Sequence, residues 1–141
     1  MVTDERRQDR DNEDADEGAA LSAGEARLRD EFFAGPRIAT FEDHLDQLDA
    51  IANSTRFMIC YLLYEDGDTT YNELNDATDK VGNALNYHLD TLQTAGLITQ
   101  SKQRVDGQER SIYSLSILGQ KLIEPMIELI VEEGDLAEQY T

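Results

Sequence analysis

One segment breaks the helical pattern of this sequence: two runs of strand-forming residues are joined through the pair Asp106-Gly107. The runs cover residues 97–102 and 110–115. Asp-Gly between such runs is a strong hairpin signal, because both residues adopt the positive φ angles that tight turns between strands require. The sequence therefore predicts one β-hairpin in a chain whose pattern is otherwise helical.

The residues before the hairpin predict two helices at the centre of the core. Apolar residues recur at steps of three and four along residues 41–52, which indicates an amphipathic helix. Asn53 is a suitable N-cap for a second helix over residues 54–64, which is apolar on nearly all sides. We expect that second helix to be buried.

A short helix comes next. Thr70 and Glu73 have the spacing of a capping box, in which each side chain bonds the backbone amide of the other residue. A helix over residues 71–77 is expected after this cap.

The following helix carries two different faces. It is expected over residues 80–95, capped by Thr78 or Asp79, with Gly96 in the left-handed conformation that ends many helices. Its apolar stripe is expected to face the core and consists of Val81, Leu85, Leu89 (or His88) and Leu92. Its opposite face is polar and consists of Asn83, Asn86, Tyr87 and Asp90.

The last predicted helix, over residues 116–133, has more apolar surface than so small a domain can cover. Pro125 lies inside it and is expected to bend it or to break it locally. Its apolar band consists of Leu118, Leu122, Ile123, Met126, Ile127, Leu129, Ile130 and Val131. Pairing with a second copy of the chain would cover this band. The alternative is that the helix folds back onto the helix over residues 41–52.

This order of elements predicts a mainly α (α+β) fold, a winged helix-turn-helix with a two-stranded β-hairpin wing and a C-terminal dimerisation helix. Four segments are expected, and they are a disordered acidic tail (1–24), an N-terminal arm (25–40), a DNA-binding domain (41–115) and a dimerisation helix (116–141).

The charge of the chain is large and uneven. The net charge is −18, from 30 acidic and 12 basic residues, of which three are lysines. Such acid-rich, lysine-poor composition suggests a salt-loving organism, because at about 1 M salt the screening length is roughly 3 Å and self-repulsion costs little. Residues 80–121 hold five basic and three acidic residues, and this basic island is where an anionic partner could dock. Chance scatter of charges is the alternative.

Three motifs in this order resemble the ArsR family of winged-helix regulators. They are the run from Leu48 to Ile59, the run from Asn83 to Leu92 followed by Gly96-Leu97-Ile98, and the run from Ser114 to Gly119. The middle run is also similar to acidic, haloarchaeal winged-helix regulators. The resemblance covers about residues 42–122 and implies a homodimer that binds double-stranded DNA, with recognition helices in successive major grooves.

Carried onto this sequence, the resemblance implies that Asn83, Asn86 and Tyr87 face the bases. Asparagine can pair with both hydrogen-bonding atoms of adenine. The candidate phosphate contacts are Lys80, Lys102, Arg104 and Arg110. Asp90 departs from the expected pattern, because an acid on that face repels DNA. The alternative for each residue is an ordinary solvated position.

Other reactive residues give weaker signals. Cys60 is a possible redox switch, although a cysteine in so apolar a run is more often buried filler. His88 and Arg56 are expected to have structural roles. A metal site is not expected, because no cysteine pair or histidine cluster accompanies the helices. No cofactor is expected either.

Two further classes of function compete with the DNA-binding regulator. The acidic total favours a winged-helix protein–protein interaction module of the transcription machinery. An enzyme is not expected, since the sequence lacks a phosphate-binding glycine loop, a nucleophile with a nearby base and paired carboxylates. Without a signal peptide or a long apolar run, a cytoplasmic location is expected and no membrane contact. The target sequence and the direction of regulation are not encoded in these patterns.

Overall fold

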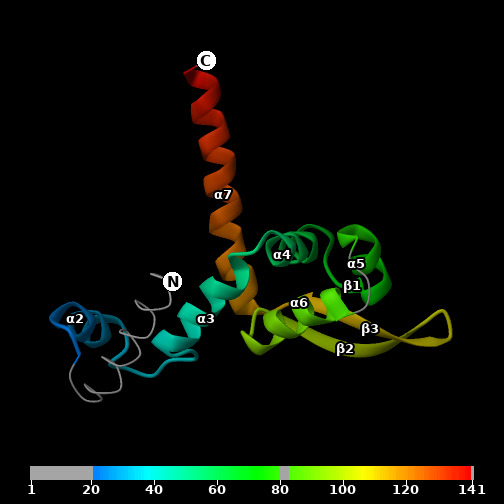
Figure 1. Ribbon diagram of the computed structural model, residues 1–141, viewed down its shortest axis with the longest axis horizontal. Coiled ribbons are helices and arrows are strands. Elements are labelled where there is room, and N and C mark those ends of the chain that lie inside the picture. Colours follow the sequence, from blue (N-terminus) through cyan, green and yellow to red (C-terminus); the bar gives the residue numbers. More distant parts are fainter. Residues whose placement is uncertain (1–20, 80–82, 141) are drawn as a thin grey trace, which may run out of the picture. The chain divides into compact units, whose positions relative to one another are not determined.

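The computed structural model describes residues 21–79 and 83–140 of the chain, in two units. The first unit ends at Phe41 and the second begins at Glu42. The first contains helix α2 (Ala23–Phe32), and the second contains the remaining helices and the sheet (Figure 1). Most of the predicted acidic tail, residues 1–20, lies outside the described residues.

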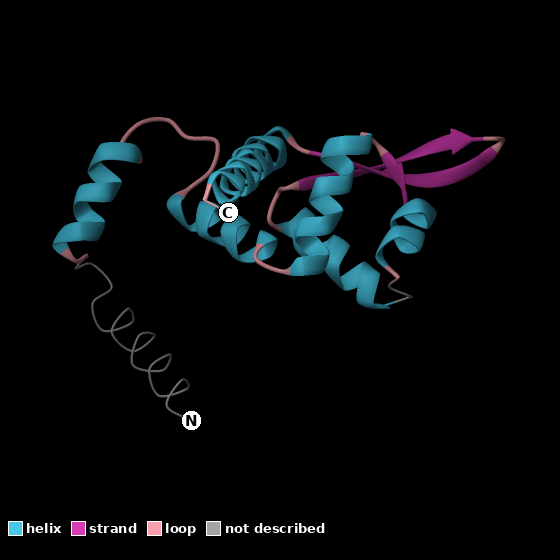
Figure 2. Ribbon diagram, turned by 90° about the horizontal axis from the view of Figure 1, so that it is seen from above, coloured by secondary structure: helices cyan, strands magenta, loops and turns pink. Residues whose placement is uncertain are grey.

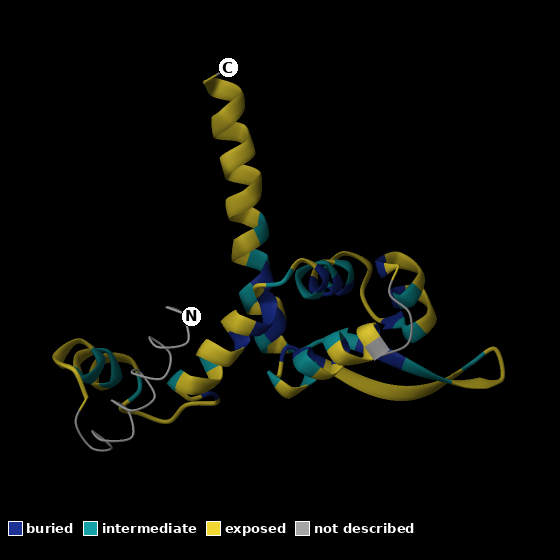
Figure 3. Ribbon diagram, viewed as in Figure 1, coloured by how far each residue is buried: buried dark blue, intermediate teal, exposed yellow. Residues whose placement is uncertain are grey.

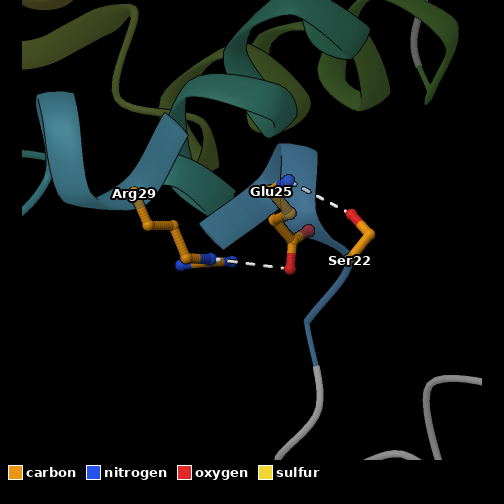
Figure 4. Close-up of polar contacts among 3 residues, drawn as sticks. All are labelled: Ser22, Glu25 and Arg29. Carbon is orange, nitrogen blue, oxygen red and sulfur yellow. Dashed lines mark hydrogen bonds and ion pairs between the residues drawn. The ribbon is translucent and has the colours of Figure 1, made fainter. Parts of the chain in front are cut away.

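Helix α2 begins two residues before the predicted arm, because Ser22 caps it. The Ser22 hydroxyl accepts a hydrogen bond from the backbone amide of Glu25 at 3.1 Å. The Glu25 carboxylate then pairs with the Arg29 guanidinium at 3.6 Å, one helical turn further on (Figure 4). In the same unit, the Arg29 guanidinium lies 5.1 Å from the centre of the Phe41 ring.

Helices α3 (Phe41–Ile51) and α4 (Ser54–Asp66) confirm the two predicted core helices. Asn53 separates them and caps α4, since its side-chain oxygen accepts a hydrogen bond from the amide of Arg56 at 3.1 Å. Helix α4 supplies the fully buried residues Ile59 and Cys60 to the core.

The helix-turn-helix consists of α5 (Tyr71–Thr78) and α6 (Asn83–Thr94). Thr70 caps α5 as predicted, with its hydroxyl accepting from the amide of Glu73 at 3.2 Å. The predicted role of Thr78 or Asp79 as a cap of the next helix is wrong. The Thr78 hydroxyl bonds back to the Leu74 carbonyl, and Asp79 is left-handed (φ 52°), so both residues end α5.

The core stripe of α6 matches the prediction where the structure describes it. Leu85, Leu89 and Leu92 are buried, and Val81 lies outside the described residues. Gly96 follows the helix with φ 80°. The amide of Leu97 bonds the carbonyl of Leu92 at 3.0 Å, which closes the last turn around this glycine.

The wing is longer than predicted. Strands β2 (Ile98–Val105) and β3 (Gln108–Leu115) meet in a two-residue turn, Asp106 and Gly107, whose φ angles are 53° and 78°. A turn of this primed type matches the twist of the strands, so pairing continues to the Val105–Gln108 pair. Figure 2 shows the two strands running together to the tip of the hairpin.

A third strand, β1 (Thr69–Thr70), was not predicted. It pairs antiparallel with β3, through Thr69 opposite Tyr113, and gives the strand order β1-β3-β2. A two-residue strand has no periodicity of its own, and it exists because its partner strand is adjacent in space.

Helix α7 (Ile117–Gln139) ends six residues beyond the predicted end at Glu133 and is continuous through Pro125. The predicted local break is therefore absent from this helix. Gly119 and Ile123 are buried in its first turns, and Figure 3 colours the second half of the helix as exposed. Among the described residues, none of the helices combines the length and the hydropathy needed to cross a bilayer.

Candidate nucleic-acid interface

The exposed side of α6 carries the predicted base-reading residues. Asn86 is exposed, and 56% of Tyr87 is accessible to solvent. Asn83 is the first residue of α6, and its side chain lies outside the part that the structure describes. Gln93 is seven residues after Asn86, so these two residues share one flank of the helix, while Tyr87 lies on the other side of its polar face.

Arg56 and His88 attach α6 to the core. The Arg56 Nη1 group donates to His88 Nδ1 at 3.2 Å, and its Nε group donates to the carbonyl of Ala50 at the end of α3. Because arginine has no acceptor, His88 accepts this bond through an unprotonated Nδ1. The edge of the Tyr87 ring lies against the imidazole, with ring centres 5.5 Å apart. These contacts agree with the structural roles expected for both residues.

The strand register places the basic residues of the wing on two different faces. Lys102 is opposite Ser111 and Arg104 is opposite Glu109, whereas Arg110 is opposite Gln103. Since side chains alternate between the faces of a sheet, Lys102 and Arg104 share one face and Arg110 lies on the other.

A side-chain contact with α6 identifies which of these faces adjoins that helix. The Gln93 amide on α6 donates to the side-chain oxygen of Gln100 at 3.3 Å, and Gln100 is on the face of Lys102 and Arg104. Asn86 therefore lies on the flank of α6 that adjoins the wing face of Lys102 and Arg104, and Arg110 lies on the opposite face of the wing. Lys80 lies outside the described residues. The sequence could have predicted that Arg104 and Arg110 lie on opposite faces, because side chains alternate along each strand and the turn has two residues.

Side-chain contacts hold both wing arginines near the turn. Arg104 Nη2 donates to the carbonyl of Gly107 at 3.3 Å, and Arg110 Nη2 donates to the side-chain oxygen of Gln108 at 3.1 Å. Glu109 opposes Arg104 across the ladder and offsets part of its charge. The positive charge of the wing is consequently small. Its neutral polar side chains would have to supply most of the hydrogen bonds to a bound anion.

An acidic hollow limits the interface at the other end of α6. Asp90 lines it together with Asp46 and Asp49 of α3, around a volume of about 320 Å³. Three carboxylates beside the C-terminal half of the helix repel phosphates. The hollow therefore disfavours anions on the Asp90 side of α6, whereas the flank of Asn86 and Gln93 adjoins the wing face that carries Gln100. The sequence identified Asp90 as an acid on a face expected to contact DNA. It could not show that α3 places Asp46 and Asp49 beside Asp90.

A second concave surface is apolar and lies between α4 and α7. Its volume is about 780 Å³, and its apolar lining comes from Ile51, Phe57, Met58, Tyr61, Ile127, Ile130 and Val131. The sequence predicted the α7 residues of this groove as unpaired apolar surface. It did not predict the contribution of α4, which was expected to be wholly buried.

Cys60 is buried, and this burial raises the pKa of its thiol from 9.0 to about 12. Thiolate is the reactive form of cysteine, so this environment favours the buried-filler interpretation over the redox switch. Within residues 21–79 and 83–140, no group of three histidine, cysteine or acidic side chains is arranged to hold a metal ion.

Labelling of this thiol should be strongly dependent on unfolding. At pH 8 we expect Ellman's reagent to modify Cys60 in the folded protein at least about 100-fold more slowly than in the chain unfolded by guanidinium. Folding favours the neutral thiol of Cys60. This preference contributes to the free energy of unfolding below pH 9, and the contribution is lost as the pH rises from 9.0 towards 12. Cys60 is the only cysteine in the sequence, so all of the labelling signal comes from this residue. Equal rates in both states would contradict the burial.

Comparisons with known proteins identify the fold. No model of a known protein family matches the sequence, and no curated protein has a significantly similar sequence. Among solved structures, a MarR-family transcriptional regulator from Enterococcus faecalis V583 is similar with a TM-score of 0.59 and 17% identity, over 76% of this chain and 97% of that one.

Two further structures share this fold. HlyU from Vibrio cholerae N16961 has a TM-score of 0.51 and 28% identity, over 62% of this chain and 91% of its own. MepR of S. aureus, solved as a complex with DNA, has a TM-score of 0.55 and 21% identity, over 69% of this chain and 78% of its own. The predicted winged helix-turn-helix fold is confirmed.

Proposed function

We propose that this chain is a sequence-specific, DNA-binding transcriptional regulator that acts as a homodimer. The observation that carries the proposal is the exposed amide Asn86 on the same flank of α6 that contacts the wing face of Lys102 and Arg104. A protruding helix beside a hairpin can enter a major groove while the hairpin follows the adjacent backbone. The fold it shares with MepR, which was solved with DNA, supports this assignment.

In this proposal, Asn83, Asn86 and Tyr87 contact bases, and Lys102 and Arg104 contact phosphates. A bidentate asparagine–adenine pair contributes about 1–3 kcal/mol of discrimination, whereas a phosphate contact holds the protein in register without reading sequence. Arg110 is left out because the register places it on the opposite face. Residues 41–115 then form the DNA-binding domain, and residues 116–141 form the dimerisation helix.

The finer assignment is an ArsR-like regulator of a salt-loving organism. The motifs from Leu48 to Ile59 and from Asn83 to Leu92 support the ArsR-like type. The net charge of −18 supports operation in high salt, where self-repulsion is screened.

Fluorescence anisotropy tests the proposal. The probe is a fluorescein-labelled duplex that the wild-type protein selects from a random-sequence pool in about 2 M KCl. We expect Asn86→Ala to weaken binding about tenfold and to relax discrimination at one base pair. Arg104→Ala should weaken binding of all duplexes by a similar factor and lower the salt slope by about one.

The matched control is Arg110→Ala, which removes the same charge from the other face of the wing. It should change affinity by less than about twofold. If the wild-type protein selects no duplex, or if Asn86→Ala and Arg104→Ala both bind like the wild type, the DNA-binding mechanism is wrong. The interaction module, which the acidic hollow at Asp46, Asp49 and Asp90 would favour, then becomes the better proposal.

A further inference from the structure

A chain of hydrogen bonds between uncharged side chains crosses from the recognition helix to the wing. Gln93 on α6 donates to Gln100 on β2 at 3.3 Å, and the Gln100 amide donates to the hydroxyl of Ser111 on β3 at 3.1 Å. All three belong to the flank and wing face that carry Asn86, Lys102 and Arg104. We call Gln93, Gln100 and Ser111 the amide ladder.

The surroundings of the ladder are unusual for this protein. Strand β2 exposes six consecutive residues, Thr99 to Arg104, and none of them is acidic. The whole stretch from Thr91 to Val105 contains no acid, although the sequence holds 30 acidic residues. This stretch therefore supplies no acid of its own, and the acids beside it are Glu109, opposite Arg104 on the same face, and Asp90, one helical turn before Gln93 on α6. It also has few cations to attract phosphates.

The ladder retains hydrogen-bond donors. Each glutamine amide has two N–H groups and uses one in the ladder, and Ser111 accepts there without using its own hydroxyl hydrogen. Exposed bonds between neutral side chains add little to stability, because water competes for both partners. The ladder does place two amides and a hydroxyl side by side between α6 and the wing.

We propose that the amide ladder binds the sugar–phosphate backbone of the operator through neutral hydrogen bonds whose strength is independent of salt. The proposal rests on the proposed function, since it assumes that α6 and the wing face contact DNA. Phosphate oxygens accept hydrogen bonds from neutral donors such as glutamine and serine as well as from lysine and arginine. Neutral contacts displace no counterions from DNA, so salt does not weaken them in the way that it weakens ion pairs.

The test compares salt dependence rather than affinity alone. With the selected duplex, binding is measured by anisotropy from about 0.2 to about 2 M KCl. The double variant Gln93→Ala plus Gln100→Ala should bind about tenfold more weakly at every salt concentration, with the slope of log K against log salt unchanged. Lys102→Ala plus Arg104→Ala should instead reduce the magnitude of the slope by about two.

A control and a second variant complete the test. Gln103→Ala removes an amide from the opposite face of the same strand and should leave affinity unchanged within about twofold. Gln100→Glu keeps the shape of the side chain and adds a charge, so its loss of affinity should be largest at low salt and shrink as salt rises.

Four results are distinguishable. Wild-type affinity for the alanine double variant overturns the ladder proposal and leaves the proposed function intact. A loss of affinity that fades at high salt also overturns it, because the contact would then be electrostatic. A loss equally large in Gln103→Ala overturns the assignment to this face. Failure of the wild-type protein to select any duplex removes the proposed function and the ladder with it.

Discussion

Gly119→Ala is expected to destabilise the winged-helix unit by about 3 kcal/mol or more. A Cβ atom at this position would lie 2.2 Å from the carbonyl oxygen of Leu97 and 3.1 Å from a methyl group of Leu115. The carbonyl cannot move away cheaply, because it accepts the amide of Ser116 at 2.9 Å. The same serine caps α7 through the amide of Gly119, so relief of the clash would loosen the junction between β2, β3 and α7.

Gly134→Ala is the matched control, since it lies in the same helix with nothing within 4 Å of the added atom. Alanine is a better helix former than glycine by about 1 kcal/mol, so this control should stabilise the protein slightly. Thermal unfolding followed by circular dichroism in high salt measures both changes. We expect the Tm of Gly119→Ala to fall by more than about 10 °C. A Tm at or above that of the wild type would contradict the close approach of the Leu97 carbonyl to Gly119.

The elements that the sequence predicted well are those whose signals are local. Asn53, Thr70 and Gly96 cap helices, and Asp106-Gly107 forms the turn, because each depends on a side chain or φ preference within a few residues. The same locality explains the error at Thr78 and Asp79. Both residues can either begin or end a helix, and here Asp79 adopts the left-handed conformation that ends α5.

The features that the sequence did not predict depend on contacts between distant segments. Strand β1 forms because Thr69 lies opposite Tyr113, and the acidic hollow forms because α3 brings Asp46 and Asp49 beside Asp90. The separation of Arg110 from Arg104 was within reach of sequence reasoning, since it follows from the two-residue period. The amide ladder could not be predicted from the sequence, because it depends on how close α6 and β2 lie in space.

The largest effect on assembly is expected from Ile130→Glu. Ile130 lines the apolar groove, 53% of the residue is exposed in the single chain, and the same helix also exposes Leu129, Val131 and Leu136. In the proposed homodimer a second copy covers this surface. In an isologous interface each copy carries the substitution, so two carboxylates would have to be buried in apolar surroundings. We expect the dissociation constant of the dimer to rise at least about 100-fold.

Light scattering coupled to size-exclusion chromatography in about 2 M KCl reports the mass directly, and anisotropy with the selected duplex reports the consequence for DNA. Gln139→Glu adds the same charge to an exposed position of α7 and should leave the protein dimeric. Loss of the dimer should abolish tight binding of the duplex, because a monomer has one recognition helix and can contact only one of the two half-sites. If the wild-type chain is monomeric at micromolar concentration, or if Ile130→Glu stays dimeric, then α7 does not form the interface. The apolar face would in that case need a different partner, and tight DNA binding would have to come from a single winged-helix unit.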